Sequence, residues 1–346
     1  MSDRGETAHV PWGPPYLLYL GSATDELSIK TARGLAYWRP QWCLGQHRRR
    51  DCTVTLGLPD LALDQAKARG ANTMVIGAAN AGGVMGEEIV ADAIAALDAG
   101  LHVASGLHHK LRDHPAIVAA AQRNQRALFD ARAAGPGIPV GNGRPRSGRR
   151  LLTVGTDCSV GKMYTALALE RSLRRRGHPA DFRATGQTGI LIAGAGIPVD
   201  AVVADFVSGA AESISPARPD GGWDLIEGQG SLFHPSYAGV SLGLLHGSQP
   251  DALVLCHEPT RRHMRGLPEY PVPDLRACME ANLAAARLTN PAVRPIGIAL
   301  NTSGLPAHEA ADICQRIGAL FGLPCEDPVT MGVESLVDHL IASFPN

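Results

Sequence analysis

The sequence predicts an α/β protein made of two doubly wound domains. Short apolar runs alternate with helical patterns along most of the chain, and this alternation is typical of parallel sheets covered by helices. It is interrupted over residues 134–150 by a stretch rich in Gly, Pro and Arg. A length of 346 residues also exceeds one typical domain. We therefore expect a tail over 1–15, domains over 16–133 and 150–346, and a linker over 134–149.

The elements of the first domain follow from its hydrophobic pattern. Continuous apolar runs over 16–21, 73–80 and 101–106 predict buried parallel strands. An amphipathic helix closed by a glycine is expected over 86–100. The segment 115–133 has the same helical spacing and begins with Pro, which favours the first position of a helix.

The second domain repeats the alternation. Six apolar runs are expected to form another parallel sheet: 150–155, 181–185, 199–206, 223–228, 251–258 and 295–301. Helices are expected over 162–176, 275–288 and 306–321. The first of these ends in basic residues and Gly, which a helix C-terminus favours.

Composition and charge exclude several classes of partner. A formal net charge of −1 gives no electrostatic footprint for nucleic acid or an anionic membrane surface. Seven dispersed cysteines without a CxxC pair indicate reduced thiols rather than a disulfide framework. No apolar run approaches the length of a membrane span or a signal core. We expect a soluble cytoplasmic protein that forms a homo-oligomer and acts on a small molecule.

The segment "GTDCSVGKMYT" (155–165) matches most of the sequence pattern of a phosphate-binding P-loop. It lies between an expected strand and an expected helix, where backbone N–H groups and the positive helix end would face an anion. Lys162 would add a positive charge at the phosphate. The alternative interpretation of the segment is a Gly-rich turn that precedes a helix and binds no anion. Nine loop residues are candidates for cofactor binding: Gly155, Thr156, Asp157, Cys158, Ser159, Val160, Gly161, Lys162 and Met163.

Met163 stands where a standard P-loop has the Ser or Thr hydroxyl that binds magnesium. Thr165 cannot replace it, because two further residues at about 100° each turn it to another side of the helix. Two possibilities stay open. Asp205 and Glu227, at expected strand ends, could hold the metal alone, although each could also be a solvated acid. Otherwise the loop binds a phosphate ligand that needs no tightly held metal, such as the pyrophosphate of coenzyme A.

Two loops at expected strand ends carry candidate acid–base groups. Glu227 precedes "GQGSLFHP", whose glycines permit close backbone approach, and His234 in that segment could carry a proton. The segment "CHEPTRRHMRG" (256–266) adds His257 and Glu258. We expect the catalytic residues to come from these four side chains.

Candidate substrate contacts lie in two loops. Arg261 and Arg262 suit bidentate recognition of a carboxylate, and they would fit a dicarboxylate or a phosphate ligand. The alternative interpretation is that they form the exposed basic start of a helix. The segment "TGQTGILIAGAGIP" reads as a Gly-rich loop suited to a small polar substrate. Its candidate residues are Thr185, Gln187 and Thr188.

These motifs together resemble a known family. "GTDCSVGKMYT", "TGQTGILIAG", "EGQGSLFHPSYAGVSLGLLHGSQPD", "CHEP" and "GIALNTS" are similar to segments of the bacterial D-glutamate N-acetyltransferase family, over roughly residues 16–342. The resemblance implies a Rossmann-like N-terminal domain and a P-loop NTPase-like C-terminal domain. It also implies acetyl transfer from acetyl-CoA to the amine of D-glutamate, or of a related dicarboxylic amino acid, in D-amino acid catabolism.

The loop also resembles, more distantly, that of dethiobiotin synthetase, an ATP-dependent enzyme. This resemblance places Lys162 on phosphate, Asp205 and Glu227 at the metal-side acidic positions, and Asn301 at a base-reading position. Met163 departs from the pattern and puts the use of magnesium and a nucleotide in doubt.

Three functions therefore compete. The first is an acetyl-CoA-dependent N-acetyltransferase. The second is an ATP- and magnesium-dependent ligase or kinase acting on a carboxylate. The third is a nucleotide-binding regulator without catalysis. Two loops rich in His, Glu and Arg argue against this third function.

Overall fold

The computed structural model describes residues 12–26, 28–78 and 84–345. The chain divides into two compact units. The first comprises Met1–Ala133 together with Ile190–Gly194, and the second comprises Ala134–Gly189 and Ala195–Asn346. None of the helices in these described ranges is both long and apolar enough to cross a membrane.

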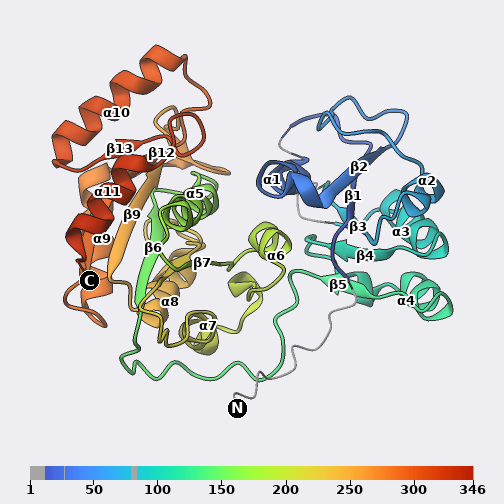
Figure 1. Ribbon diagram of the computed structural model, residues 1–346, viewed down its shortest axis with the longest axis horizontal. Helices are drawn as coiled ribbons and strands as arrows, with labels where there is room; N and C mark the ends of the chain where they lie inside the picture. Colours follow the sequence, from blue (N-terminus) through green and yellow to red (C-terminus); the bar gives the residue numbers. More distant parts are fainter. Residues whose placement is uncertain (1–11, 27, 79–83, 346) are drawn as a thin grey trace. The chain divides into compact units, whose positions relative to one another are not determined.

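A five-stranded parallel sheet in the order β2-β1-β3-β4-β5 forms the centre of the first unit (Figure 1). Its strands are β1 (Tyr16–Gly21), β2 (Cys43–Arg48), β3 (Thr73–Ile76), β4 (His102–Ser105) and β5 (Leu128–Asp130). Every residue of β1 is buried, which explains its unbroken apolar run. The strand expected over 16–21 is confirmed. Of the strand expected over 73–80, only the first four residues are extended in β3, and residues 79 and 80 lie outside the described ranges.

Helices cover this sheet and complete the core of the first unit. They are α1 (Lys30–Trp38), α2 (Leu63–Ala68), α3 (Glu87–Asp98) and α4 (Pro115–Arg123). Apolar side chains of α2, α3 and α4 pack with those of β1, β3 and β4 in one buried cluster. Trp12 stacks on Phe129 of β5 with ring centroids 3.7 Å apart.

The single helix expected over 115–133 is wrong in its second half. Helix α4 ends at Arg123, and Gln125 has a φ of +53°, which a continuing helix does not permit. The chain then enters β5, where Leu128 pairs with Val103. Pairing with β4 therefore outweighs the helical spacing of this segment.

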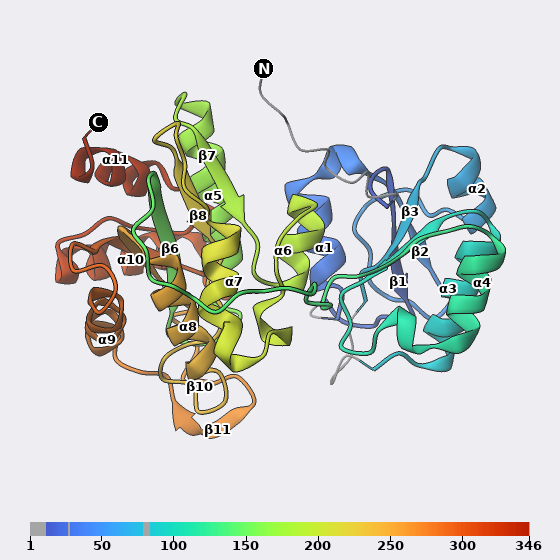
Figure 2. The same cartoon turned by 90° about the horizontal axis from the view of Figure 1, so that it is seen from below.

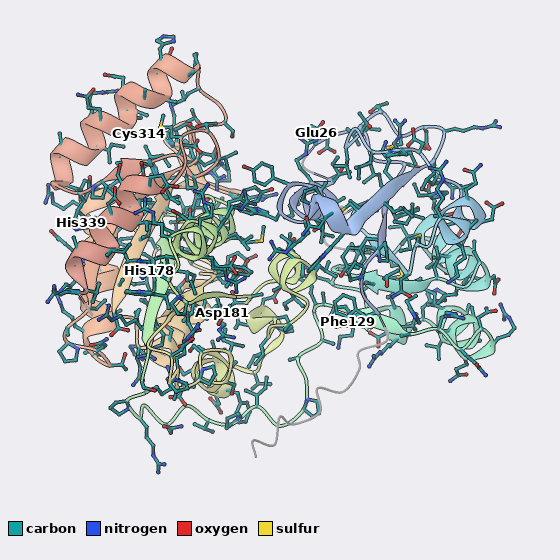
Figure 3. All side chains as sticks on the ribbon, in the orientation of Figure 1. Glu26, Phe129, His178, Asp181, Cys314 and His339 are labelled. Atoms are coloured by element: carbon teal, nitrogen blue, oxygen red, sulfur yellow. The ribbon has the colours of Figure 1, made fainter. Side chains whose placement is uncertain are left out.

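The second unit contains a six-stranded parallel sheet in the order β13-β12-β9-β6-β8-β7. Its strands are β6 (Arg149–Gly155), β7 (Ala180–Arg183), β8 (Trp223–Ile226), β9 (Ala252–His257), β12 (Arg294–Leu300) and β13 (Cys325–Glu326). A short antiparallel hairpin of β10 (His263–Met264) and β11 (Leu267–Pro271) lies outside the sheet (Figure 2). At the β7 edge, Arg218 pairs with Asp181, labelled in Figure 3, and with Asp224, at 2.7 and 3.0 Å.

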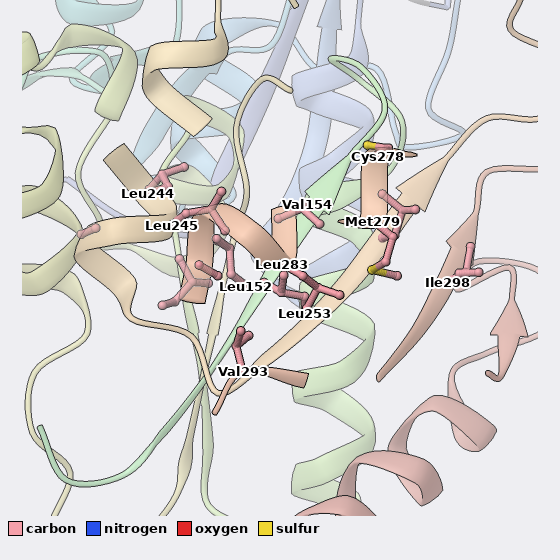
Figure 4. Close-up of a cluster of buried hydrophobic side chains, with 14 of the residues drawn as sticks. Leu152, Val154, Leu244, Leu245, Leu253, Cys278, Met279, Leu283, Val293 and Ile298 are labelled. Carbon is pink, nitrogen blue, oxygen red and sulfur yellow. The ribbon is translucent and has the colours of Figure 1, made fainter. Parts of the chain in front are cut away.

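Helices cover both faces of this sheet. They are α5 (Lys162–Arg175), α7 (Val207–Ile214), α8 (Ala238–Ser248), α9 (Leu275–Arg287), α10 (Ala307–Phe321) and α11 (Glu334–Ser343). Helix α6 (Gln187–Ala193) begins in the second unit, and its residues from Ile190 belong to the first. One core cluster joins α8 and α9 to the strands through Leu244, Leu283, Leu152 and Leu253 (Figure 4). Helices α5 and α11 pack together and against the sheet through other residues. Both domains are thus α/β with parallel sheets, and the helices expected over 275–288 and 306–321 are confirmed.

Two expectations for the second unit are wrong. The strand expected over 199–206 is instead two 3-10 turns, Val199–Ala201 and Ala204–Phe206, because Ala201 N–H and Phe206 N–H close onto carbonyls three residues back. Val203 between them is 67% exposed, which a buried strand would not allow. The Gly-rich loop expected over 185–198 contains helix α6.

Candidate functional site

The phosphate loop joins β6 to α5, as the sequence predicts. Gly155 ends the strand, and Gly161 precedes the helix with a φ of +103°, a conformation that favours glycine. Ser159 also adopts a left-handed conformation, with a φ of +56°. Within the described ranges, the backbone N–H groups of Val160, Gly161 and Lys162 have no hydrogen-bond acceptor. The loop therefore presents successive donors at a positive helix end, which suits an anion.

Lys162 is buried and linked to two backbone carbonyls. Its Nζ donates to the carbonyl oxygens of Asp157, at 2.7 Å, and Gly230, at 2.8 Å. Burial lowers the pKa of this ammonium group, and the neighbouring Cys158 and Asp157 act in the opposite direction. Lys162 thus connects the phosphate loop to the segment that follows β8.

Asp157 organises the loop from inside. Its side chain is fully buried, and Oδ1 accepts the Cys158 N–H at 2.6 Å. Oδ2 accepts Nη1 of Arg261 and the backbone N–H of Arg265, both at 2.7 Å. Arg261 also donates to the Cys158 carbonyl at 2.6 Å and pairs with Glu258. Four of the expected site residues therefore hold one another, and the Arg261 guanidinium is already engaged within the protein.

Arg262 differs from its neighbour. It is exposed, and its side chain has no ion-pair or hydrogen-bond partner in the part of the chain that the structure describes. Of the two arginines expected to bind a carboxylate, Arg262 is the one whose planar fork remains available.

The hydroxyl that a standard P-loop directs at magnesium is absent from this site. Met163 is the second residue of α5 and is half-buried. The Thr165 hydroxyl donates to the Gly161 carbonyl at 3.0 Å and accepts from the Cys256 thiol at 3.4 Å, so it does not substitute. Asp205 is exposed on a 3-10 turn rather than at a strand end. These residues do not fit the magnesium site of a standard P-loop.

Glu227 follows β8 and is a buried carboxyl rather than a solvated acid. Its Oε2 accepts the backbone N–H groups of Thr185, at 3.0 Å, and Gly186, at 3.1 Å. Burial raises the pKa of Glu227 to about 7, although those N–H groups and Lys162 act to lower it. The Thr185 hydroxyl donates to the Glu227 carbonyl at 2.6 Å, so these two expected residues form one unit.

The sequence indicates a close backbone approach after Glu227, but not the residue that is approached, which is Thr153. Gly228 donates its N–H to the Thr153 hydroxyl at 3.0 Å, and a Cβ at Gly228 would lie 1.6 Å from the Thr153 carbonyl oxygen. The Gln229 amide donates to the Thr185 hydroxyl at 3.2 Å. The glycine pair in "EGQGS" was the available signal, because close backbone approach requires glycine.

His257 and Asn301 lie at the ends of the adjacent strands β9 and β12. Burial, with the Arg261 charge, lowers the pKa of His257 to about 4, so the ring is neutral at physiological pH. Its Nδ1 lies 3.0 Å from the Thr156 hydroxyl. Asn301 donates its backbone N–H to the His257 carbonyl at 2.8 Å, and its Cβ lies 3.9 Å from the Cβ position of Gly161. Both residues therefore border the phosphate loop.

The remaining expected site residues are Gln187, Thr188 and His234. Gln187 and Thr188 are half-buried in the first turn of α6, directly after the Thr185–Gly186 backbone that binds Glu227. His234 is 97% buried, and a ring nitrogen, the Cys158 sulfur and an Asp157 carboxylate oxygen all lie within 4.8 Å of one another.

Comparison with known proteins decides the family. Residues 139–337 match a family model described as "Domain of unknown function (DUF1611_C) P-loop domain", and residues 47–134 match the corresponding "Rossmann-like domain". A curated relative from a Pseudoalteromonas species, named D-glutamate N-acetyltransferase, is 50% identical over 94% of this chain and 98% of its own length. The chain belongs to the D-glutamate N-acetyltransferase family.

Two further comparisons agree in sequence and fold. A relative with the same name from Tritonibacter scottomollicae is 50% identical over 95% of this chain and 98% of its own length. The crystal structure of a DUF1611 family protein from Anabaena variabilis is 31% identical, with a TM-score of 0.83, and covers 94% of this chain and 99% of that chain. The resemblance, the Rossmann-like and P-loop domains, and the class of enzyme are thus confirmed, and the protein is an N-acetyltransferase.

Proposed function

We propose that this protein transfers the acetyl group of acetyl-CoA to the amine of D-glutamate. The observation that carries the proposal is the 50% identity, over nearly the full length of both chains, to two relatives named for this acetyl acceptor. The site is compatible with such a donor, because coenzyme A carries phosphates and the loop offers N–H donors and the Lys162 ammonium.

The phosphate loop is proposed to hold the phosphates of coenzyme A without magnesium. Positive charge comes from Lys162, Arg261 and Arg265, of which the last donates Nη1 to the Ser159 hydroxyl at 2.7 Å. These charges replace the function of a metal ion near the anion. Met163 then needs no hydroxyl.

Arg262 and Glu227 are proposed to serve the amino acid. Arg262 is exposed and can form paired hydrogen bonds with a carboxylate of the substrate. Glu227, with a pKa near 7, is suited to accept the proton that the amine releases as the N–C bond forms. The C–S bond of the thioester breaks in the same transfer, and this proton can pass to the departing CoA thiolate. Because the pantetheine arm separates the thioester from the phosphates, this role requires the arm to fold back over the loop. Gln187 and Thr188 would then border the acceptor.

The test measures the acetylated product and released CoA thiol when purified protein is mixed with acetyl-CoA and D-glutamate. L-Glutamate and D-alanine serve as matched acceptors that change the chirality or remove the second carboxylate. Formation of N-acetyl-D-glutamate without ATP or magnesium is the expected result. A strict requirement for ATP, with ADP or AMP formed in proportion to product, would favour the ligase function instead.

A further inference from the structure

His234 carries a buried N–H group that lacks an acceptor among the described residues. Its Nδ1 accepts the backbone N–H of Ser236 at 3.1 Å. A neutral imidazole has one donor and one acceptor nitrogen, so this bond places the proton on Nε2. Nε2 is buried and unpartnered, whereas almost all buried donors in proteins have an acceptor. The Nε2–H group is therefore available to an acceptor that a ligand supplies.

The position of the ring identifies the ligand site. A ring nitrogen of His234 lies within 4.8 Å of both the Cys158 sulfur and an Asp157 oxygen, in the phosphate loop. The carbonyl of Gly230, four residues earlier, accepts Nζ of Lys162 at 2.8 Å. The segment from Gly230 to His234 thus borders the loop at both of these points.

The chemistry of this cluster suits an anion better than a metal cation. Both Asp157 oxygens already accept hydrogen bonds, and one of the donors is the Arg261 cation. The lone pair of His234 Nδ1 is occupied by Ser236. What remains available is the Nε2–H donor, in a cluster whose Asp157 is bound by the Arg261 cation and whose loop also carries Lys162. Such a set attracts an anionic oxygen.

We infer that His234 is a neutral hydrogen-bond donor to a phosphate oxygen of the ligand held by the loop. Ser236 acts as a positioning residue, because its amide keeps the ring proton on Nε2. The inference rests on the proposed function only in taking coenzyme A as the phosphate ligand. It assigns His234 to phosphate binding, rather than to the proton transfer that the sequence suggests.

Three substitutions separate donation from proton transfer. A glutamine amide can present an N–H near the Nε2 position, so His234→Gln should bind acetyl-CoA within about threefold of wild type in calorimetric titration. His234→Leu, which has no donor, should weaken binding by about 10- to 100-fold. For both variants, kcat at saturating acetyl-CoA should stay close to wild type. His308→Gln, on the exposed face of α10, is the matched control.

The contrary results are equally specific. If His234→Gln and His234→Leu both lose about 100-fold or more in kcat and bind acetyl-CoA normally, His234 transfers protons and the inference is wrong. Zinc binding that disappears in both His234→Gln and Cys158→Ser would also overturn it, in favour of a metal site. Titration with dephospho-CoA, which lacks the 3′-phosphate, shows which phosphate His234 contacts. If His234→Leu loses the same affinity for dephospho-CoA and for acetyl-CoA, the contact is to the pyrophosphate. If it loses affinity for acetyl-CoA alone, the contact is to the 3′-phosphate.

A measurement on the unmodified protein avoids any folding defect of the variants. ¹⁵N imidazole resonances should show His234 in the Nε2–H form, with its N–H proton shifting when inorganic pyrophosphate or CoA is added. An Nδ1–H form, or no shift with either probe, would overturn the inference. If the shift occurs and D-glutamate is not acetylated, only the proposed function fails.

Discussion

Nη1 of Arg261 lies 2.7 Å from Oδ2 of Asp157, although 104 positions separate the two residues in the chain. The contact joins the loop after β9 to the phosphate loop after β6 and neutralises a fully buried carboxylate. Arg261 is therefore part of the support of the phosphate loop. Its neighbour Arg262 is exposed, so its replacement is expected to affect stability and substrate binding differently.

Arg261→Met should impair both substrates and the fold. Removal of the cation leaves the buried Asp157 carboxylate with backbone N–H donors but without its ion-pair partner, and breaking a buried ion pair typically costs about 3–5 kcal/mol of unfolding free energy. We expect the KM values for acetyl-CoA and D-glutamate to rise together, because the loop loses its support. Arg262→Met should leave the unfolding free energy unchanged and raise only the KM for D-glutamate. Steady-state kinetics and urea unfolding of both variants test this contrast, and equal behaviour of the two would contradict it.

Lys162→Met should weaken binding of acetyl-CoA by about 10- to 100-fold, since a hydrogen bond to a charged group contributes about 1.5–3 kcal/mol. Calorimetric titration measures the effect. Lys110→Met, which removes an exposed lysine in the first unit, is the control for charge. Unchanged affinity in Lys162→Met would mean that the loop is not the phosphate site.

Glu227 should make stability depend on pH. Burial raises its pKa from 4.5 to about 7 in the folded protein. Between these values the unfolded chain releases the proton and the folded chain retains it, so the contribution of Glu227 to the unfolding free energy falls as pH rises. The fall is complete near pH 7 and amounts to about 3 kcal/mol.

Glu227→Gln should remove this dependence. Urea unfolding from pH 5 to 8 should show the variant gaining stability relative to wild type as pH rises, with the difference levelling above pH 7. Glu309→Gln, at an exposed carboxyl, should run parallel to wild type. Parallel profiles for Glu227→Gln would show that the buried carboxyl is ionised throughout.

Met163→Thr should leave acetyl transfer within about tenfold of wild type, equivalent to about 1.4 kcal/mol, because the proposed reaction uses no metal at this position. The new hydroxyl should also create measurable affinity for magnesium–ATP. Calorimetry with ATP and magnesium checks this gain, and Thr165→Val should not produce it. Loss of acetyl transfer in Met163→Thr, with magnesium-dependent ATP hydrolysis in wild type, would support the ligase.

Local signals sufficed where the sequence pattern and the tertiary structure agree. The apolar run at 16–21 predicts β1 to the residue, and the phosphate loop lies between strand and helix as its spacing requires. The segment 199–206 failed because an apolar composition does not say whether a neighbouring strand is available to pair with it. The partner of Arg261 was equally inaccessible, since Asp157 meets it only through the order of strands in the sheet.

The contact between Gly228 and Thr153 restricts how this enzyme can evolve. Any side chain at Gly228 would overlap the Thr153 carbonyl, so β6 would first have to move away from β8. Because the obstacle is a backbone carbonyl, no substitution at Thr153 can remove it, and a single replacement of Gly228 should not be tolerated. In a library of random variants selected for survival, Gly228 should accept nothing, whereas Gly239, whose Cβ position has no neighbour within 4 Å, should accept many residues.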